Sequence, residues 1–222
     1  MQRAFATALF AMLVFSSAAF AQPGAIPTPV AAPVDSFQLS YVANLDLADA
    51  TINLTNTGTL TLPTGLTTTG NMCVNVYAFD PTAVMIACCS CLVAPNAVNS
   101  LSVNNDIRTP SIGRQKPTSM AIKLLATTPL GLTATGSGGH CDPTSPTATP
   151  AGPGVFGSLV PGMRAWQTST HRIPAPPGIA LTEFSFTPST LSPAELTKLV
   201  IQCGFLRTSG IGMCNNCQTG GQ

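Results

Sequence analysis

Residues 72–93 read MCVNVYAFDPTAVMIACCSCLV and contain the clearest structural signal in the chain. Two β-rich apolar runs, 72–79 and 84–93, flank the turn sequence Asp80-Pro81-Thr82-Ala83. Aspartate and proline favour a tight reversal, and two such runs on either side of it predict an antiparallel β-hairpin. The fold prediction starts from this hairpin.

The second strand of the hairpin has no polar face. Side chains alternate along a strand, so one face is expected to carry Val84, Ile86, Cys88 and Leu92, and the other Met85, Ala87, Cys89, Cys91 and Val93. A strand that is apolar on both faces is normally buried on both. We therefore expect an opposing sheet on one face and a separate covering segment on the other.

Eight cysteines are disulfide candidates: Cys73, Cys88, Cys89, Cys91, Cys141, Cys203, Cys214 and Cys217. Folding the hairpin brings Cys73 level with Cys89 and Cys91, so a bridge from Cys73 into that cluster is geometrically feasible. At least one further bridge is expected from the C-terminal segment into the cluster. Cys141 stands alone and is expected to tether the segment around it.

One helix is predicted, over about residues 193–204. Ser192-Pro193-Ala194-Glu195 forms a capping box with proline at the first helical position. The apolar stripe that follows consists of Leu196, Leu199, Val200 and Cys203. Gly204 is expected to end the helix. This helix and the tail with Cys214 and Cys217 are the expected cover for the second face of the cysteine-rich strand.

Other β-rich runs punctuated by turn residues predict strands at 37–42, 50–56, 59–62, 98–103, 119–127, 164–173 and 179–187. Residues 104–117 are predicted to form a polar loop. Residues 133–161 are rich in Gly, Pro, Ser and Thr, and a stretch of this kind is usually functional or disordered. The predicted fold is mainly β: an Ig-like or jelly-roll-type antiparallel β-sandwich with one C-terminal helix, cross-linked by disulfides.

The N-terminus predicts export. Arg3, an uncharged apolar run over 4–20 and the small-x-small pattern at 19–21 are typical of a signal peptide cleaved after about Ala21. Residues 22–36 form a proline-rich arm, 37–217 a single domain and 218–222 a flexible tail. No later run is apolar enough to span a membrane. We expect a secreted, extracellular or periplasmic protein, in which paired cysteines form disulfides.

The low content of charged residues indicates which classes of binding partner to expect. Charged residues make up 8% of the chain, whereas an ordinary globular protein has about 25%. The formal net charge is +1 and no basic stripe is present, so a nucleic-acid partner is not expected. Low net charge promotes association. The leading hypothesis is therefore a structural, adhesive or self-assembling extracellular protein, with donation of the arm 22–36 to a neighbour's sheet edge as one route.

Two alternatives stay open. A carbohydrate-binding module would use Trp166, the only tryptophan, together with the loop 133–161 to hold surface glycans. A metal-binding or redox protein would use Cys88–Cys91 and the Cys-x-x-Cys spacing of Cys214 and Cys217. Because oxidising conditions favour disulfides over thiolates, neither a metal site nor a cofactor is predicted.

No catalytic residue is predicted, and the chain is not expected to be an enzyme. The sequence holds neither Gly-x-Ser-x-Gly nor His-Glu-x-x-His. Only two histidines are present, His140 and His171. His140 precedes Cys141, but neighbours in sequence rarely face each other, and an oxidised Cys141 is no nucleophile.

The pattern as a whole resembles a group of uncharacterised secreted bacterial proteins. The similarity rests on 73–80 (CVNVYAFD), 87–91 (ACCSC), Pro95-Asn96, the helix with Cys203 and the tail with Cys214 and Cys217. It covers roughly residues 40–217, as expected for a single exported unit. The resemblance implies a bacterial, exported origin. It implies no activity, because the group has no known function.

Overall fold

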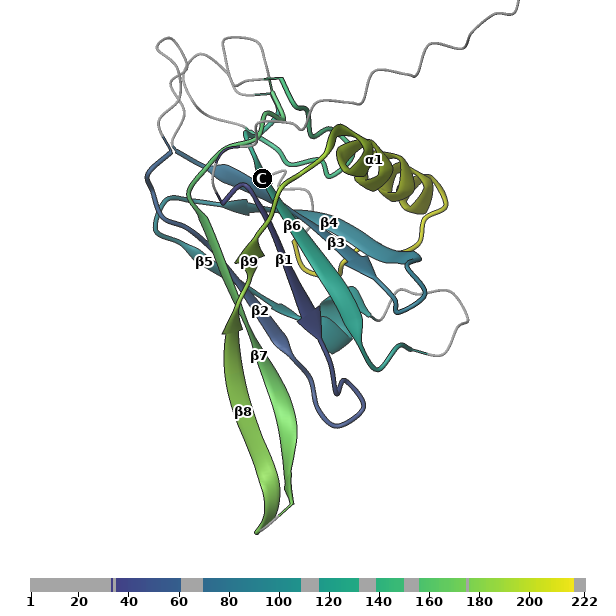
Figure 1. Cartoon of the computed structure of the whole chain (residues 1–222). Coiled ribbons are helices and arrows are strands. Elements are labelled where there is room, and N and C mark those ends of the chain that lie inside the picture. Colours follow the sequence, from purple (N-terminus) through teal and green to yellow (C-terminus); the bar gives the residue numbers. More distant parts are fainter. Residues whose placement is uncertain are drawn as a thin grey trace, which may run out of the picture.

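Two antiparallel β-sheets pack face to face, and one C-terminal helix covers the outer face of the larger sheet (Figure 1). The computed structural model describes residues 33, 35–60, 70–108, 116–131, 139–149, 156–174 and 176–217. The predicted signal peptide, most of the arm and the tail 218–222 lie outside these residues. The prediction of a mainly-β sandwich with one C-terminal helix is confirmed.

The larger sheet, sheet A, has the strand order β4-β3-β6-β1-β9, and the smaller, sheet B, has the order β5-β2-β7-β8. The elements are β1 (Phe37–Val42), β2 (Thr51–Asn56), β3 (Met72–Phe79), β4 (Met85–Val93), β5 (Val98–Ser102), the π-helical turn η1 (Val103–Ile107), β6 (Met120–Thr127), β7 (Met163–Pro174), β8 (Pro177–Ser185), β9 (Thr187–Pro188) and α1 (Pro193–Thr208).

Most predicted strands form where they were expected, and two regions differ. Thr59 and Leu60 are not in a strand, and the rest of the predicted strand 59–62 lies outside the described residues. The predicted polar loop 104–117 begins with η1, whose Ile107 is fully buried. The rest of that loop up to residue 115 lies, apart from Arg108, outside the described residues.

The main core lies between the two sheets. In β2, buried Ile52 and Leu54 alternate with half-buried threonine and asparagine, which is the pattern of a strand with one face inward. Every residue of β3 is buried, because sheet B covers one of its faces. On the other face, Tyr77 and Phe79 pack with Leu199 and Cys203 of α1 in a second apolar cluster.

A β-bulge changes the expected faces of β4. Strict alternation predicts Met85 on the face of Ala87 and Cys89, and this prediction is wrong. The register with β3 shifts between Ala78 and Phe79, so Ile86 has no partner and an inserted residue resets the alternation. Met85 therefore lies on the face of Cys88, in the cluster under α1. Ile86 contacts the core between the sheets instead.

The helix is longer than predicted. Ser192 caps its start and accepts a hydrogen bond from the backbone N–H of Glu195, as the capping box predicts. Gly204 does not end it, and α1 continues to Thr208. A glycine within a helix costs only about 1 kcal/mol. Burial of Leu206 beyond it, in the cluster shared with β3 and β4, offsets that cost.

Candidate functional site

All eight cysteines are paired in four disulfides. Three bridges, which we call the C-terminal clamp, join β4 to the last part of the chain: Cys88–Cys203, Cys89–Cys214 and Cys91–Cys217. The fourth joins Cys73 to Cys141. The expected bridge from the C-terminal segment into the cluster is confirmed, as is the tethering of Cys141. No cysteine is free in this structure.

The bridge from Cys73 into the cluster, which folding of the hairpin made feasible, does not form, because Cys73 is bonded to Cys141. Cys73 lies opposite Leu92 in the hairpin, whereas Cys89 and Cys91 lie opposite Val76 and Val74. Directly opposite residues share a face, and successive residues alternate. Cys73 therefore points to the outer face of sheet A, where Cys141 meets it, while Cys89 and Cys91 point to the other face.

The tail after α1 closes the outer edge of β4. The backbone N–H of Cys88 donates to the carbonyl of Gly212 at 2.8 Å. The backbone N–H of Asn215 donates to the carbonyl of Asp106 at 3.0 Å, and the Asn216 amide donates to the Asp106 carboxylate at 3.0 Å. The helix thus covers the outer face of the cysteine-rich strand, as predicted. The tail, which was expected to cover that face too, instead closes the edge of β4 and is bonded to Cys89 and Cys91 on the face towards sheet B.

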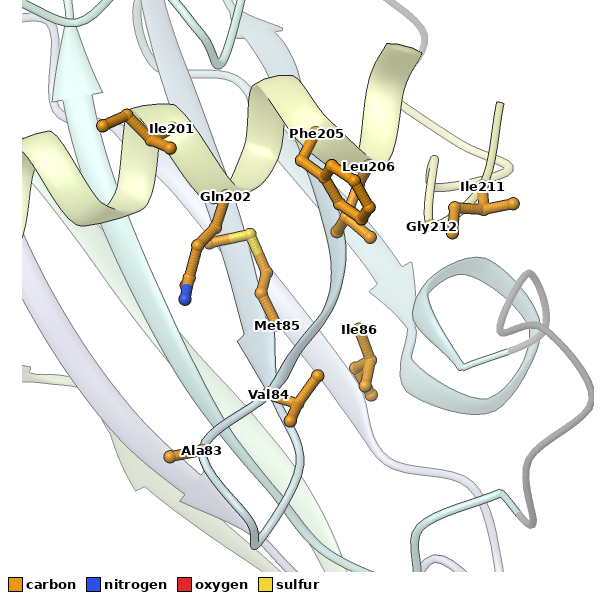
Figure 2. A pocket seen from close by; sticks show the side chains of 10 residues that line it. All are labelled: Ala83, Val84, Met85, Ile86, Ile201, Gln202, Phe205, Leu206, Ile211 and Gly212. Atoms are coloured by element: carbon orange, nitrogen blue, oxygen red, sulfur yellow. The ribbon is translucent and has the colours of Figure 1, made fainter. Parts of the chain in front are cut away.

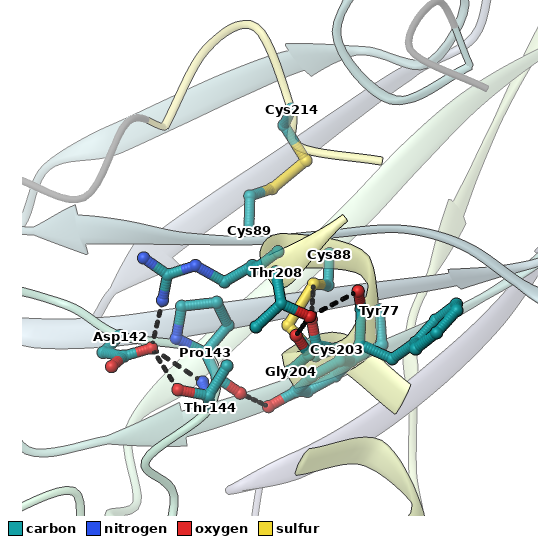
Figure 3. Close-up of a disulfide and its surroundings, with 12 residues drawn as sticks. Tyr77, Cys88, Cys89, Asp142, Pro143, Thr144, Cys203, Gly204, Thr208 and Cys214 are labelled. Atoms are coloured by element: carbon teal, nitrogen blue, oxygen red, sulfur yellow. Dashed lines mark hydrogen bonds and ion pairs between the residues drawn. A yellow bond between two sulfur atoms is a disulfide. The ribbon is translucent and has the colours of Figure 1, made fainter. Parts of the chain in front are cut away.

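Residues 139–149 cover another part of the outer face of sheet A (Figure 3). The hydroxyl of buried Tyr77 donates to the carbonyl of Pro143 at 2.8 Å. Burial, and secondarily the negative charge of Asp142, raise the pKa of Tyr77. The raised pKa keeps the phenol protonated near neutral pH, so it acts there as a hydrogen-bond donor that fixes this segment.

Asp142 holds the same segment against α1 (Figure 3). Its carboxylate accepts hydrogen bonds from the backbone N–H of Thr144 at 2.9 Å and the Thr144 hydroxyl at 2.7 Å, and it pairs with Arg207. Partial burial acts to raise the pKa of Asp142, but the hydrogen bonds from Thr144 and the charge of Arg207 outweigh it and lower the pKa. The arrangement is that of a structural ion pair.

The two histidines do not form a site. The backbone of His140 exchanges hydrogen bonds with that of Leu130, and its neighbour Cys141 is bonded to Cys73. His171 lies on β7 with its ring edge-on to that of Phe184, at 6.2 Å between centroids. Within the described ranges, no three His, Cys, Asp or Glu side chains gather where they could hold a metal ion.

Trp166 and residues 139–149 of the loop predicted to act with it lie on different sheets. Trp166 lies opposite Asn53 and alternates with core-facing Ala165, so it points to the outer face of sheet B. It lines a cavity of about 750 Å³ with Arg164, Glu183 and Phe184. Residues 139–149 are bonded to Cys73 and Tyr77 of sheet A instead. Trp166 thus lies on sheet B, whereas residues 139–149 lie against sheet A.

An apolar groove, which we call the α1 groove, lies between α1, the start of β4 and the tail (Figure 2). Its volume is about 690 Å³, and it is lined by Ala83, Val84, Met85, Ile86, Ile201, Gln202, Phe205, Leu206, Ile211 and Gly212. None of these residues is charged. Phe205 is 68% exposed and Ile201 64% exposed, so the groove presents large apolar side chains to solvent.

The β7–β8 hairpin is the second exposed apolar surface, and it projects from the body of the molecule (Figure 1). Leu181 is 73% exposed and Ile179 65% exposed, and the two share a face of β8. Ile173 and Phe184 are exposed on the other face. Residues 173–181 contain no charged side chain. The tip of the hairpin and α1 lie at different ends of the molecule (Figure 1).

Sequence reasoning missed both surfaces, although each leaves a signal. Ile201 and Phe205 are four residues apart and form a second apolar stripe on α1, outside the stripe that contacts sheet A. Along β8, the large apolar residues Ile179 and Leu181 alternate with small or polar residues. Such a pattern predicts a half-buried strand, and only the structure shows that nothing described covers it.

Comparisons of the chain with protein-family models, with curated proteins and with solved structures found no match. In the part of the chain that the structure describes, no helix is long and apolar enough to cross a membrane.

Proposed function

We propose that this is an extracellular, non-catalytic protein that assembles with copies of itself, the β7–β8 hairpin of one copy seated in the α1 groove of the next. The four disulfides support the extracellular part, because such bonds persist in oxidising compartments. The predicted signal peptide agrees with it. The observation that carries the proposal is the pair of exposed apolar surfaces, one projecting and one concave.

The hairpin projects and the groove is concave, and both present apolar side chains. A projecting apolar element and an apolar groove elsewhere on the same molecule make a head-to-tail contact, which extends into an open chain unless the rotation between copies closes a ring. The groove lining carries no charge. On the hairpin, Arg172 lies directly opposite Ile179 and Glu183 follows two residues after Leu181, so charged side chains flank the apolar pair on its own face. The low net charge of the chain adds little repulsion between copies.

The strength of one contact can be bounded. Fully burying Ile179 and Leu181 would contribute roughly 3–6 kcal/mol, against at least about 4 kcal/mol for lost translational and rotational freedom. A single contact is therefore expected to be weak, and assembly should depend steeply on concentration. Sedimentation velocity of the mature protein over a concentration series measures this dependence.

A complementation experiment tests the geometry. Leu181→Lys alters only the hairpin and Phe205→Lys only the groove, so each variant alone is expected to associate at least about tenfold more weakly than the wild type. In a mixture, the intact hairpin of one variant meets the intact groove of the other. The expected product is a heterodimer that grows no further.

Tyr41→Lys is the matched control. Tyr41 is exposed on β1, outside both surfaces, and its replacement should leave assembly unchanged. Intact mass of each variant checks that all four disulfides have formed. A wild type that stays monomeric at high concentration, or variants that assemble as the wild type does, would refute the proposal.

A further inference from the structure

The outer edge of β8 is an open sheet edge. β8 is the last strand of sheet B and pairs with β7 alone in the described structure. Every residue of β8 is exposed or half-exposed, and Glu183 is its only charged side chain. Natural proteins usually guard such an edge with charge, proline, a bulge or a covering segment. A covering segment for the free edge of β8 has to come from outside the described residues.

The chain reverses direction just before β1. The backbone N–H and the hydroxyl of Ser36 both donate to the carbonyl of Pro33, at 3.1 and 2.8 Å, and Asp35 has a left-handed φ of 66°. A hydrogen bond between residues three apart closes a β-turn. β1 runs antiparallel to β9, which continues the path of β8. A chain that leaves this turn upstream in an extended conformation would run parallel to β8, towards its first residues.

The turn also lies beside the end of β8. Asp35 forms an ion pair with Arg164 of β7. The same aspartate lines the cavity of about 750 Å³ whose wall includes Glu183 and Ser185, the last part of β8. The turn that precedes β1 therefore lies at the end of β8 from which a parallel strand formed by residues 22–32 would have to start. At about 3.3 Å per residue, these eleven residues reach about 36 Å, and the nine residues of β8 span about 30 Å.

The positions of the prolines fit one edge of a strand. Pro23, Pro27, Pro29 and Pro33 all have odd numbers. In an extended strand, the N–H and C=O of one residue point to the same side and successive residues alternate, so all four prolines leave the even-numbered side intact. Gly24, Ile26, Thr28, Val30 and Ala32 keep their N–H groups on that side. Proline is tolerated in an edge strand whose N–H side faces solvent.

We propose that residues 22–32 add to the edge of β8 of their own chain as a parallel strand, in the chain cleaved after Ala21. The even-numbered residues bond to β8 and the prolines face solvent. Sheet B then has five strands, and its new edge is blocked by proline against further pairing. This differs from donation of the arm to a neighbouring copy. It does not rest on the proposed assembly, which uses the faces of the hairpin rather than its edge.

Hydrogen exchange of the mature full chain tests the pairing with two matched pairs of variants. Val30→Pro and Ile26→Pro remove an N–H from the proposed bonding side. Ala31→Pro and Ala25→Pro add the same residue one position away on the solvent side. The expected result is amide exchange in residues 178–184 at least about tenfold faster in the first pair and unchanged in the second.

The possible outcomes distinguish pairing of residues 22–32 with β8 of the same chain from its alternatives. Equal exchange in all four variants and the wild type would overturn this pairing. Protection of β8 that falls on dilution would assign the edge to a neighbour's arm and overturn pairing within one chain. Protection that persists in dilute monomer supports it. A protein that stays monomeric while β8 is protected would refute only the assembly, so the two proposals fail separately.

Discussion

Gly212 and Gly210 share the same left-handed backbone but differ in their surroundings. Both have a φ of +68°, which glycine adopts without strain. A Cβ on Gly212 would lie 2.7 Å from the carbonyl oxygen of Ile86, whereas a Cβ on Gly210 would meet nothing within 4 Å. At Gly212 the tail thus lies directly against the backbone of β4, and the Gly212 carbonyl accepts the Cys88 N–H.

We therefore expect Gly212→Ala to destabilise the fold more than Gly210→Ala. Both variants carry the backbone strain of alanine in the left-handed region, about 1–2 kcal/mol. Only Gly212→Ala adds a collision with the backbone of β4, which cannot move aside as a side chain can. Urea unfolding midpoints measure the difference. Equal urea midpoints for the two variants would show that Gly212 does not lie in close contact with the backbone of β4.

Asp142 predicts a dependence of stability on pH. Its pKa is lowered in the folded protein, so the carboxylate contributes stability above the ordinary aspartate pKa of about 4, and this contribution is lost as the pH falls through the lowered value. Asp142→Asn should lower the melting temperature at pH 7 and lose less on going to pH 3 than the wild type does. Asp46→Asn, at an exposed position, is the control. The same acid-induced loss in wild type and Asp142→Asn would contradict the assignment.

At the scale of elements, the C-terminal clamp holds α1 and the tail on β4. The bridges Cys88–Cys203 and Cys91–Cys217 close sequence separations of 115 and 126 residues. Loops of nearly equal length constrain the unfolded chain almost equally. The native surroundings differ, because Cys88 and Cys203 are buried under α1 and Cys217 is partly exposed at the tail.

Replacing both cysteines of one bridge by alanine tests this difference. We expect the Cys88/Cys203 variant to lose more stability than the Cys91/Cys217 variant, within the 2–5 kcal/mol typical of a native disulfide. The first loss adds a cavity in the cluster under α1 to the common loss of the cross-link. Denaturant midpoints under non-reducing conditions give the comparison. A larger loss for Cys91/Cys217 would show that the tail, not the helix, is the main anchor.

Element boundaries show where local patterns suffice. The turn at Asp80–Ala83 and the capping box at Ser192–Glu195 each act within a few residues, and both elements begin where predicted. The end of α1 and the faces of Met85 and Ile86 were mispredicted. Both depend on packing against distant residues: Leu206 against β3 and β4, and the bulge against Phe79.

At the scale of the whole molecule, the cross-links and the apolar surfaces divide the protein into two parts. Three disulfides and α1 cross-link and cover the region around β4. The β7–β8 hairpin extends at another end of the molecule and exposes apolar side chains on both faces (Figure 1). Rigid copies with separate projecting and concave surfaces suit an open chain of contacts. The proposed arm strand would leave those surfaces free while blocking uncontrolled pairing at the edge of β8.

The amino-acid sequence by itself determined the β3–β4 hairpin, the capped helix, the mainly-β class and the expectation that the cysteines cross-link. Turn residues, two-residue alternation and helical spacing act over a few positions and can be recognised locally. Only the tertiary structure decided which cysteines pair, because the partners lie 68 to 126 residues apart and the sheet register sets their faces. It likewise decided that Ile179, Leu181, Ile201 and Phe205 stay exposed, since burial depends on which elements pack against a side chain.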